Sequence, residues 1–136
     1  MLGADIDMSG EIWEGVGDSY DDTNFLNVLN GNGYVIKNMT STTGLFHFLG
    51  EATIENLGFE NITISNDGTD GTFGNVGAIA SQMSGGYIIN CYVANSSIET
   101  TVNTANSGNA GGLVGATENG CCSISNSNVF NTTVSG

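Results

Sequence analysis

Basic side chains are almost absent from this chain. Lys37 is the one Lys or Arg residue, against 14 Asp and Glu residues, so the formal charge at pH 7 is −13 and the isoelectric point is near 4.1. Proteins that bind nucleic acids neutralise phosphates with Lys and Arg, so this composition excludes a nucleic-acid partner. Anionic membrane surfaces are disfavoured for the same reason. The charge suits a well-solvated exterior, bound cations or a basic partner.

Long hydrophobic runs are also missing. No stretch approaches the roughly 18 apolar residues of a membrane-spanning helix, so the sequence predicts no membrane span in this piece. The opening Met1-Leu2-Gly3 lacks the basic and apolar regions of a secretory signal peptide. Residues 134–136 complete a repeat without a capping segment, so we expect the chain to be a piece of a longer protein.

Histidine is so scarce that catalytic and metal chemistry is restricted. His47 is the only histidine, and neither a zinc-peptidase helix motif nor a Cys/His cluster is present. A Ser-His-Asp triad would have to use His47, for which we predict an ordinary, partly exposed strand position instead. We therefore expect no catalytic centre and no zinc site in this chain.

Cysteine is limited to Cys91, Cys121 and Cys122, and an odd number leaves at least one thiol unpaired. In the repeat described next, Cys91 and Cys122 lie about five positions apart along adjacent strands. That separation is roughly 16 Å, which is too far for a disulfide. We expect the cysteines to act as small buried hydrophobic side chains.

What the chain does contain is an internal repeat. Residues 52–65 (ATIENLGFENITIS), 86–99 (GYIINCYVANSSIE) and 122–135 (CSISNSNVFNTTVS) align without a gap. The offsets are 34 residues (88 − 54) and 36 residues (124 − 88). Fixed-period self-similarity is the signature of a stacked, quasi-one-dimensional protein. The aligned apolar columns are Ile54, Ile88 and Ile124; Phe59, Val93 and Val129; and Ile64, Ile98 and Val134.

The composition of the repeat favours a coil of β-strands over a helical repeat. Each unit holds three short β-branched stretches, and Gly and Asn at the corners tolerate the positive φ angles that tight bends require. The hydrophobic fraction of 39% is low, but a stacked coil has only a narrow core. Disorder is the competing interpretation of such a composition, and the regular spacing of Ile and Val argues against it.

Two columns of asparagine recur at the corners, at positions 56/90/126 and 61/95/131. Stacked amides can bond to one another along the coil, or the residues can simply adopt the bend conformation. We predict an amide ladder for one of the two columns. Asn-x-Ser/Thr sequons at Asn38, Asn61, Asn95 and Asn131 are then better explained by the bend than by glycosylation.

The glycine-led apolar stretches resemble the GLUG-repeat family, whose motif is Gly-Leu-apolar-Gly. Gly112-Leu113-Val114-Gly115 matches the motif fully, Gly44-Leu45-Phe46-His47 departs at the last position, and Gly77-Ala78-Ile79-Ala80 departs at two. The family's downstream Thr/Ser-Ile-x-Asn-Cys-Tyr run is matched best by Ile88-Ile89-Asn90-Cys91-Tyr92. The resemblance covers nearly the whole chain and implies an extracellular or cell-surface, adhesin-like protein. Similar repeats occur beside the catalytic domain of IgA1-protease-type metallopeptidases.

The resemblance also implies an all-β fold, a right-handed parallel β-helix. We expect about four rungs, a rung being one circuit of the chain, with three short strands per rung and an incomplete C-terminal end. Residues 1–136 would form a single unit, with the N-terminal rung and cap in 1–43 and the repeats in 44–74, 75–110 and 111–136. The open edge of the last rung would favour self-association.

The predicted interior consists of three columns and a third wall. The first column adds Ile36 to Ile54, Ile88 and Ile124, and the other two are the columns of Phe59 and Ile64 given above. Leu45, Ile79 and Leu113, or their immediate neighbours, should line the third wall.

For function, these features predict a non-catalytic structural or adhesive segment. The insertions at residues 66–74 and 100–110 fall at the same phase of the repeat, so they would lie on one face and contact a glycan or a host protein. The alternative is an accessory segment of a secreted peptidase or glycan-active enzyme. Glycoside hydrolysis needs two carboxylates about 5–10 Å apart, for which Glu51, Glu55 and Glu60 are the candidates.

Calcium is the one cofactor that the sequence raises. The loop carboxylates of Asp67 and Asp70, and of Asp18, Asp21 and Asp22, suit an oxygen-seeking cation, although neither loop matches a known calcium motif. Ordinary solvated loops are the competing interpretation. An ice-binding array would need regular Thr columns, and column 63/97/133 reads Thr, Ser, Thr, which is too irregular.

Overall fold

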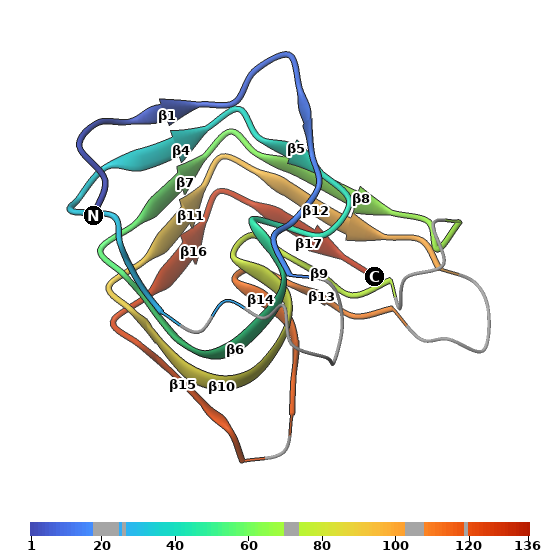
Figure 1. Ribbon diagram of the computed structural model, residues 1–136. Coiled ribbons are helices and arrows are strands. Elements are labelled where there is room, and N and C mark those ends of the chain that lie inside the picture. The colour runs from blue at the N-terminus through green and yellow to red at the C-terminus, as the bar shows by residue number, and fades with distance from the viewer. Residues whose placement is uncertain (18–24, 26, 70–73, 103–107, 119) are drawn as a thin grey trace.

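The structure is a computed structural model that describes residues 1–17, 25, 27–69, 74–102, 108–118 and 120–136. All 17 regular elements in this part of the chain are β-strands, and their pairings are parallel. The chain winds as a stack of coils, so the predicted parallel β-helix, or β-solenoid, is confirmed (Figure 1). Among the described residues, no helix has the length and hydrophobicity to cross a membrane.

Three sheets form the walls of the solenoid. The first wall consists of β1 (Ile6–Asp7), β4 (Val35–Lys37), β7 (Gly58–Glu60), β11 (Tyr92–Ala94) and β16 (Asn128–Phe130). The second wall consists of β2 (Ile12–Trp13), β5 (Thr40–Ser41), β8 (Thr63–Asn66), β12 (Ser97–Thr100) and β17 (Thr133–Ser135). The third wall consists of β3 (Val28–Asn30), β6 (Phe46–Glu55), β10 (Ala80–Ile89), β14 (Val114–Thr117) and β15 (Cys122–Ser125).

Complete rungs run through β6–β8, β10–β12 and β14–β17, and shorter N-terminal rungs run through β3–β5 and β1–β2. A small sheet of β9 (Val76–Gly77) and β13 (Ala110–Gly111) joins successive complete rungs. The ten-residue strands β6 and β10 curve around one side of the coil in Figure 1. Their curvature gives the third wall a broad, bent outer face.

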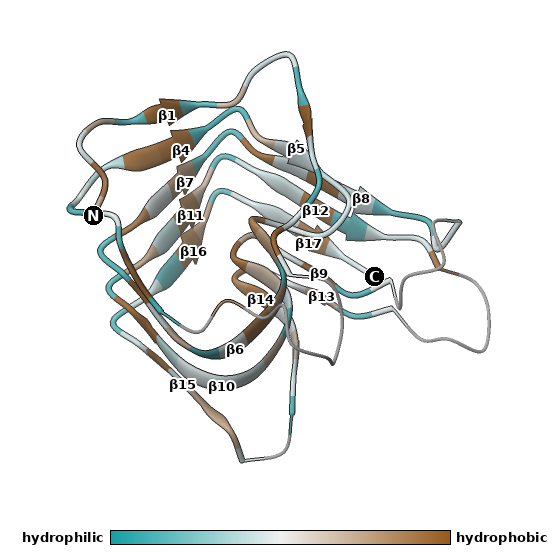
Figure 2. Ribbon diagram, viewed as in Figure 1, coloured by the Kyte–Doolittle hydropathy of each residue, from teal (hydrophilic) through white to brown (hydrophobic). Residues whose placement is uncertain are grey.

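The interior columns follow the register that the repeat predicts. Ile88 pairs with both Ile54 and Ile124. The columns of Phe59 and of Ile64 are equally in register. In the two middle rungs these side chains are fully buried, and Figure 2 shows hydrophobic segments recurring on the stacked strands of the first wall.

One predicted column member is misplaced. Ile36 pairs with Phe59 rather than with Ile54, whose partner in that rung is Leu29. The residues Ile36-Lys37-Asn38 have the same Ile-x-Asn pattern as Ile54-Glu55-Asn56, which precedes the first corner, and this likeness led to the wrong column. Asn38 instead occupies the second corner and stacks with Asn61, an offset of 23 residues (61 − 38).

The last rung is uncovered on one side. Ile124, Val129 and Val134 occupy their predicted columns but remain 46%, 40% and 40% exposed, and Phe130 is 53% exposed. Leu45 and Ile79 are buried on the third wall as predicted, and Leu113 is half-buried. Self-association through the last rung stays a prediction.

Asparagine corners hold the rungs in register. In the described chain, the eight non-glycine residues with positive φ are all Asn, with φ between 46° and 60°. At the first corner, Asn56 donates to Asn30 (3.3 Å), Asn90 to Asn56 (2.8 Å) and Asn126 to Asn90 (3.1 Å). At the second corner, Asn61 donates to Asn38 and Asn131 donates to Asn95. Hydrogen bonds between side-chain amides therefore link rungs at both corners, whereas the sequence predicted such a ladder at one corner.

We expect Asn90→Ala to lower the free energy of unfolding by about 2–4 kcal/mol. Two inter-rung amide bonds are lost, at about 1 kcal/mol each, and a Cβ-bearing residue without a polar side chain must hold positive φ, which costs a further 1–2 kcal/mol or so. Chemical denaturation measures the change. Asn90→Gly is the matched control, because it removes only the amide bonds and should lose about half as much. Equal losses in the two variants would contradict the role of the left-handed backbone.

Tyr92 bridges the first wall between rungs. Its hydroxyl donates to Glu60 Oε1 at 2.7 Å, and its ring stacks on Phe130 with centroids 5.9 Å apart. Partial burial, with the neighbouring Glu60 carboxylate as a smaller cause, raises the pKa of Tyr92 to about 12. Because the folded-state pKa lies above the ordinary value of 10.0, the neutral hydroxyl contributes stability below pH 10, and that contribution is lost as the pH rises towards 12.

Wild-type protein should therefore lose stability between pH 10 and pH 12 more steeply than Tyr92→Phe, which has no hydroxyl to ionise. Denaturation midpoints across this range measure the difference, and tyrosinate absorbance should show a late-titrating phase that the variant lacks. Parallel decline of the two proteins would show that Tyr92 ionisation does not affect folding.

Candidate functional site

A local insertion interrupts the repeat in the last rung. The offset between rungs is 34 residues at Met83 and Thr117 (117 − 83) but 36 at Gly86 and Cys122 (122 − 86). Between these two pairs the sequence of the last rung has four residues where β10 has two, Ser84 and Gly85, and the strand that is continuous in β10 is divided into β14 and β15. Such bulges redirect a strand and are common beside functional sites.

Cys121 and Cys122, at the end of this insertion, are joined to each other by a disulfide. This corrects the expectation that both are buried hydrophobic side chains, since each is half-exposed. Spacing between rungs excludes a Cys91–Cys122 pair but does not bear on two cysteines that are adjacent in the chain. Cys91 is free and 2% exposed, as expected, and burial raises the pKa of its thiol.

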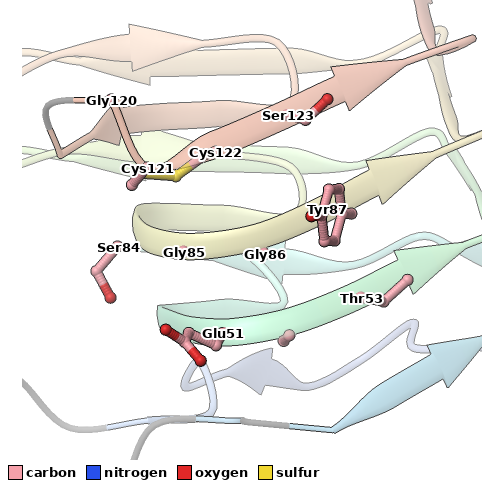
Figure 3. Close-up of a pocket in the computed structure, with 11 residues that line it drawn as sticks. Glu51, Thr53, Ser84, Gly85, Gly86, Tyr87, Gly120, Cys121, Cys122 and Ser123 are labelled. Carbon is pink, nitrogen blue, oxygen red and sulfur yellow. A yellow bond between two sulfur atoms is a disulfide. The ribbon is translucent and has the colours of Figure 1, made fainter.

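The insertion borders a hollow of about 640 Å³ on the outer face of the third wall. Gly85 lies at its centre, with Glu51 on the preceding rung, the disulfide on the following rung and Tyr87 two residues along the same strand (Figure 3). Neighbouring strands are about 4.8 Å apart, and alternate residues on one strand are about 6.7 Å apart. The hollow thus lies where Gly85 and Gly86 carry no side chain and where the last rung departs from the repeat.

Two glycines, Gly85 and Gly86, form the floor of the hollow, and the atoms around each one limit the side chain that it could carry. Gly86 has φ +85°, and a Cβ there would overlap the Ala52 carbonyl oxygen of the rung below. A Cβ at Gly85 would lie 2.9 Å from Cγ of Glu51, so the Glu51 side chain already occupies the adjacent space. Glycine at position 86 therefore follows from the close stacking of the rungs, whereas a small side chain at position 85 would displace only the Glu51 side chain.

The rim of the hollow combines an aromatic ring with polar groups. Tyr87 is 56% exposed and stands between Thr53 and Ser123 of the adjacent rungs. Glu51 is exposed, and within the described residues no hydrogen bond or ion pair engages its carboxylate. The hydroxyl of Ser84 donates to the Leu49 carbonyl oxygen at 3.4 Å.

The other carboxylates considered from the sequence are engaged elsewhere. Glu55 accepts a hydrogen bond from Asn30 at 2.7 Å, and Glu60 accepts one from Tyr92. Glu51 and Glu55 are both on β6, four residues and roughly 13 Å apart along the strand. These contacts do not assemble the close carboxylate pair that glycoside hydrolysis uses.

The described residues at the ends of the two predicted contact insertions contact one another. A Cβ at Gly68 or Gly74 would contact the Val102 side chain, and Asn109 donates from its backbone and side chain to Asn75 Oδ1, both at 3.0 Å. In Figure 1 the described residues that follow β8 and β12 lie at the ends of these strands, away from the curved strands that carry the hollow. The described parts of the insertions and the hollow are therefore separate surfaces.

The calcium candidates are only partly described. The Asp67 carboxylate accepts hydrogen bonds from the Thr69 backbone (3.0 Å) and hydroxyl (2.6 Å), which lower the pKa of Asp67. Among residues the structure describes, no three His, Cys, Asp or Glu side chains come together as a metal site. Asp18, Asp21, Asp22 and Asp70 lie outside the described residues.

Comparisons of the chain with protein-family models, curated proteins and solved structures find no match. The assignment of a function therefore rests on the residues of this chain. Sequence reasoning missed the hollow, although the change of offset from 34 to 36 residues was a visible signal of the insertion that borders it.

We expect Gly86→Ala to destabilise the protein by about 1–3 kcal/mol, because the new Cβ meets backbone and the residue must hold positive φ. Gly85→Ala should cost less than about 1 kcal/mol, since only an exposed Glu51 side chain has to move. Chemical denaturation of the two variants measures this contrast. A larger loss of stability in Gly85→Ala than in Gly86→Ala would contradict the backbone clash inferred at Gly86.

Proposed function

We propose that the chain is a non-catalytic structural and adhesive segment of an extracellular or cell-surface protein, and that it binds carbohydrate. The observation that carries the proposal is the exposed Tyr87 ring beside a bare hollow with an unengaged carboxylate. Ligand sites are typically concave surfaces with apolar or aromatic contact area and a few polar groups that fix orientation. The hollow at Gly85 combines these properties, because an aromatic ring and several polar groups surround a concave surface.

The scaffold supports this role because it holds the binding groups rigidly. Tyr87, Glu51 and the disulfide lie on three successive rungs whose backbones are hydrogen-bonded in register. Amide bonds at the corners add further links between the same rungs. A rigid site gives up less conformational entropy when it binds a ligand.

An extracellular location is supported by the Cys121–Cys122 disulfide, since disulfides persist mainly in oxidising compartments. The resemblance to the GLUG-repeat family favours the same location. An accessory role beside a peptidase or a glycan-active domain is the alternative, and it would use the same binding surface. The engagement of Glu55 and Glu60 by Asn30 and Tyr92 favours binding over catalysis within this segment.

The hollow replaces the two insertions as the leading contact surface. The insertions remain candidates, because binding residues often lie on loops held by rigid scaffolds. Their described contacts, however, are directed at one another through Val102 and the Asn75–Asn109 pair. The hollow, by contrast, has an exposed ring and a carboxylate without a partner in the described chain.

A glycan array should therefore distinguish the two surfaces. Tyr87→Ala is expected to weaken the binding of any retained glycan about tenfold, a loss of roughly 1.4 kcal/mol from the removed ring contact. Val102→Ala, which loosens the packing of the insertions, should leave binding within about twofold. Loss of binding only in Val102→Ala would move the site to the insertions. Absence of every glycan signal from the wild-type chain would leave a spacer, and the adhesive proposal would be wrong.

A further inference from the structure

The hollow has a chemical character that goes beyond general carbohydrate binding. We propose that it holds one pyranose ring, that it favours an amino sugar over a neutral sugar, and that it rejects uronic acids. This inference rests on the proposed function and names its ligand class. It is argued from the shape of the floor, the ring at one end and the charge on the rim.

The dimensions suit a single six-membered ring. The bare floor at Gly85 and Gly86 is bounded by side chains one strand spacing away, about 4.8 Å, on the preceding and following rungs. Tyr87 closes one end about 6.7 Å along the strand. One ring would lie on the outer face above the glycine backbone, and a longer glycan would continue across that face.

Tyr87 provides the apolar contact. A pyranose has an apolar face of C–H groups, and an exposed aromatic ring offers a complementary surface with a hydroxyl at its edge. The half-exposed disulfide on the following rung adds a second uncharged surface at one side of the floor. Tyr87 would contact one face of the sugar ring, and the ring's substituents would reach the polar groups of the rim.

Glu51 determines the charge preference. Its carboxylate is exposed at the rim, is without a partner in the described chain, and can accept hydrogen bonds from sugar hydroxyls or from an ammonium group. The chain's formal charge of −13 adds to the attraction for a cation. An amino sugar therefore gains an ion pair that a neutral sugar lacks.

A uronic acid finds no counterion in this chain. Lys37, the only Lys or Arg residue, is on the first wall and pairs with Asp5 at 2.8 Å. A sugar carboxylate at the hollow would face Glu51 without compensation, and like charges in contact disfavour binding. The order of affinity follows as amino sugar, neutral sugar and then uronic acid.

The test is a calorimetric titration of the full chain with three oligosaccharides of equal length, built from glucosamine, N-acetylglucosamine and galacturonic acid. At low salt, the glucosamine oligomer should bind at least about threefold more tightly than the N-acetylated one, and the difference should shrink as salt screens the pair. The galacturonic acid oligomer should not bind measurably.

The matched variants are Glu51→Gln and Glu99→Gln, which remove the same charge from the rim and from the exposed outer face of β12. Glu51→Gln should bring the glucosamine oligomer to the affinity of the neutral one, and Glu99→Gln should leave the preference in place. Tyr87→Ala should lose about tenfold in affinity for every sugar that binds. Thermal unfolding of each variant confirms that it remains folded.

The possible outcomes separate the two proposals. If no sugar binds, the proposed function is wrong. If neutral and amino sugars bind equally, or if Glu99→Gln acts like Glu51→Gln, sugar binding stands but the assignment of charge selectivity to Glu51 is overturned. An oligolysine peptide that binds as tightly as the glucosamine oligomer, and does so in Tyr87→Ala as well, would show that the surface attracts cations without recognising a sugar ring.

Discussion

The rest of the structure depends on a corner at which an asparagine holds a left-handed backbone conformation. At the described corners the chain bends from one wall into the next through an Asn with positive φ, a conformation that Asn is among the few residues to adopt at low cost. Placing the same residue at the same corner on successive rungs also aligns side-chain amides, each of which has a donor and an acceptor. Backbone geometry and inter-rung bonding are thus provided by the same residues, Asn56, Asn90 and Asn126 at one corner and their counterparts at the other.

This constraint explains how much could be read from the sequence. Ile54, Ile88 and Ile124 predict the register because a rung that slips by one residue would turn these side chains to the solvent. The walls, the interior columns and the ladder at the first corner follow from that alignment. The same reasoning failed at Ile36, because the short N-terminal rung contains an Ile-x-Asn element at the second corner as well, and a three-residue pattern does not identify which corner it occupies.

The change of offset marks the insertion in the sequence, but the floor of the hollow could not be predicted because it is formed by residues without side chains. Gly85 and Gly86 look like ordinary corner glycines in the sequence, yet they lie on a continuous strand where other rungs carry Glu51 and Ala52. The disulfide between Cys121 and Cys122 was equally hidden, since sequence spacing compares residues on different rungs and these two are neighbours on one. The hollow and the disulfide of this solenoid thus arise where the chain departs from its repeat, while the repeat itself encodes the scaffold.

The position of the hollow across three rungs has a mechanical consequence. In a stacked coil each rung is stabilised mainly by the rungs beside it, so unravelling starts at an end. The last rung of this chain has half-exposed interior side chains and carries one lip of the hollow, while the floor and the opposite lip belong to the two rungs before it. A ligand bound in the hollow would contact the last rung and the two rungs before it. Binding would therefore raise the free energy needed to unfold the terminal rung.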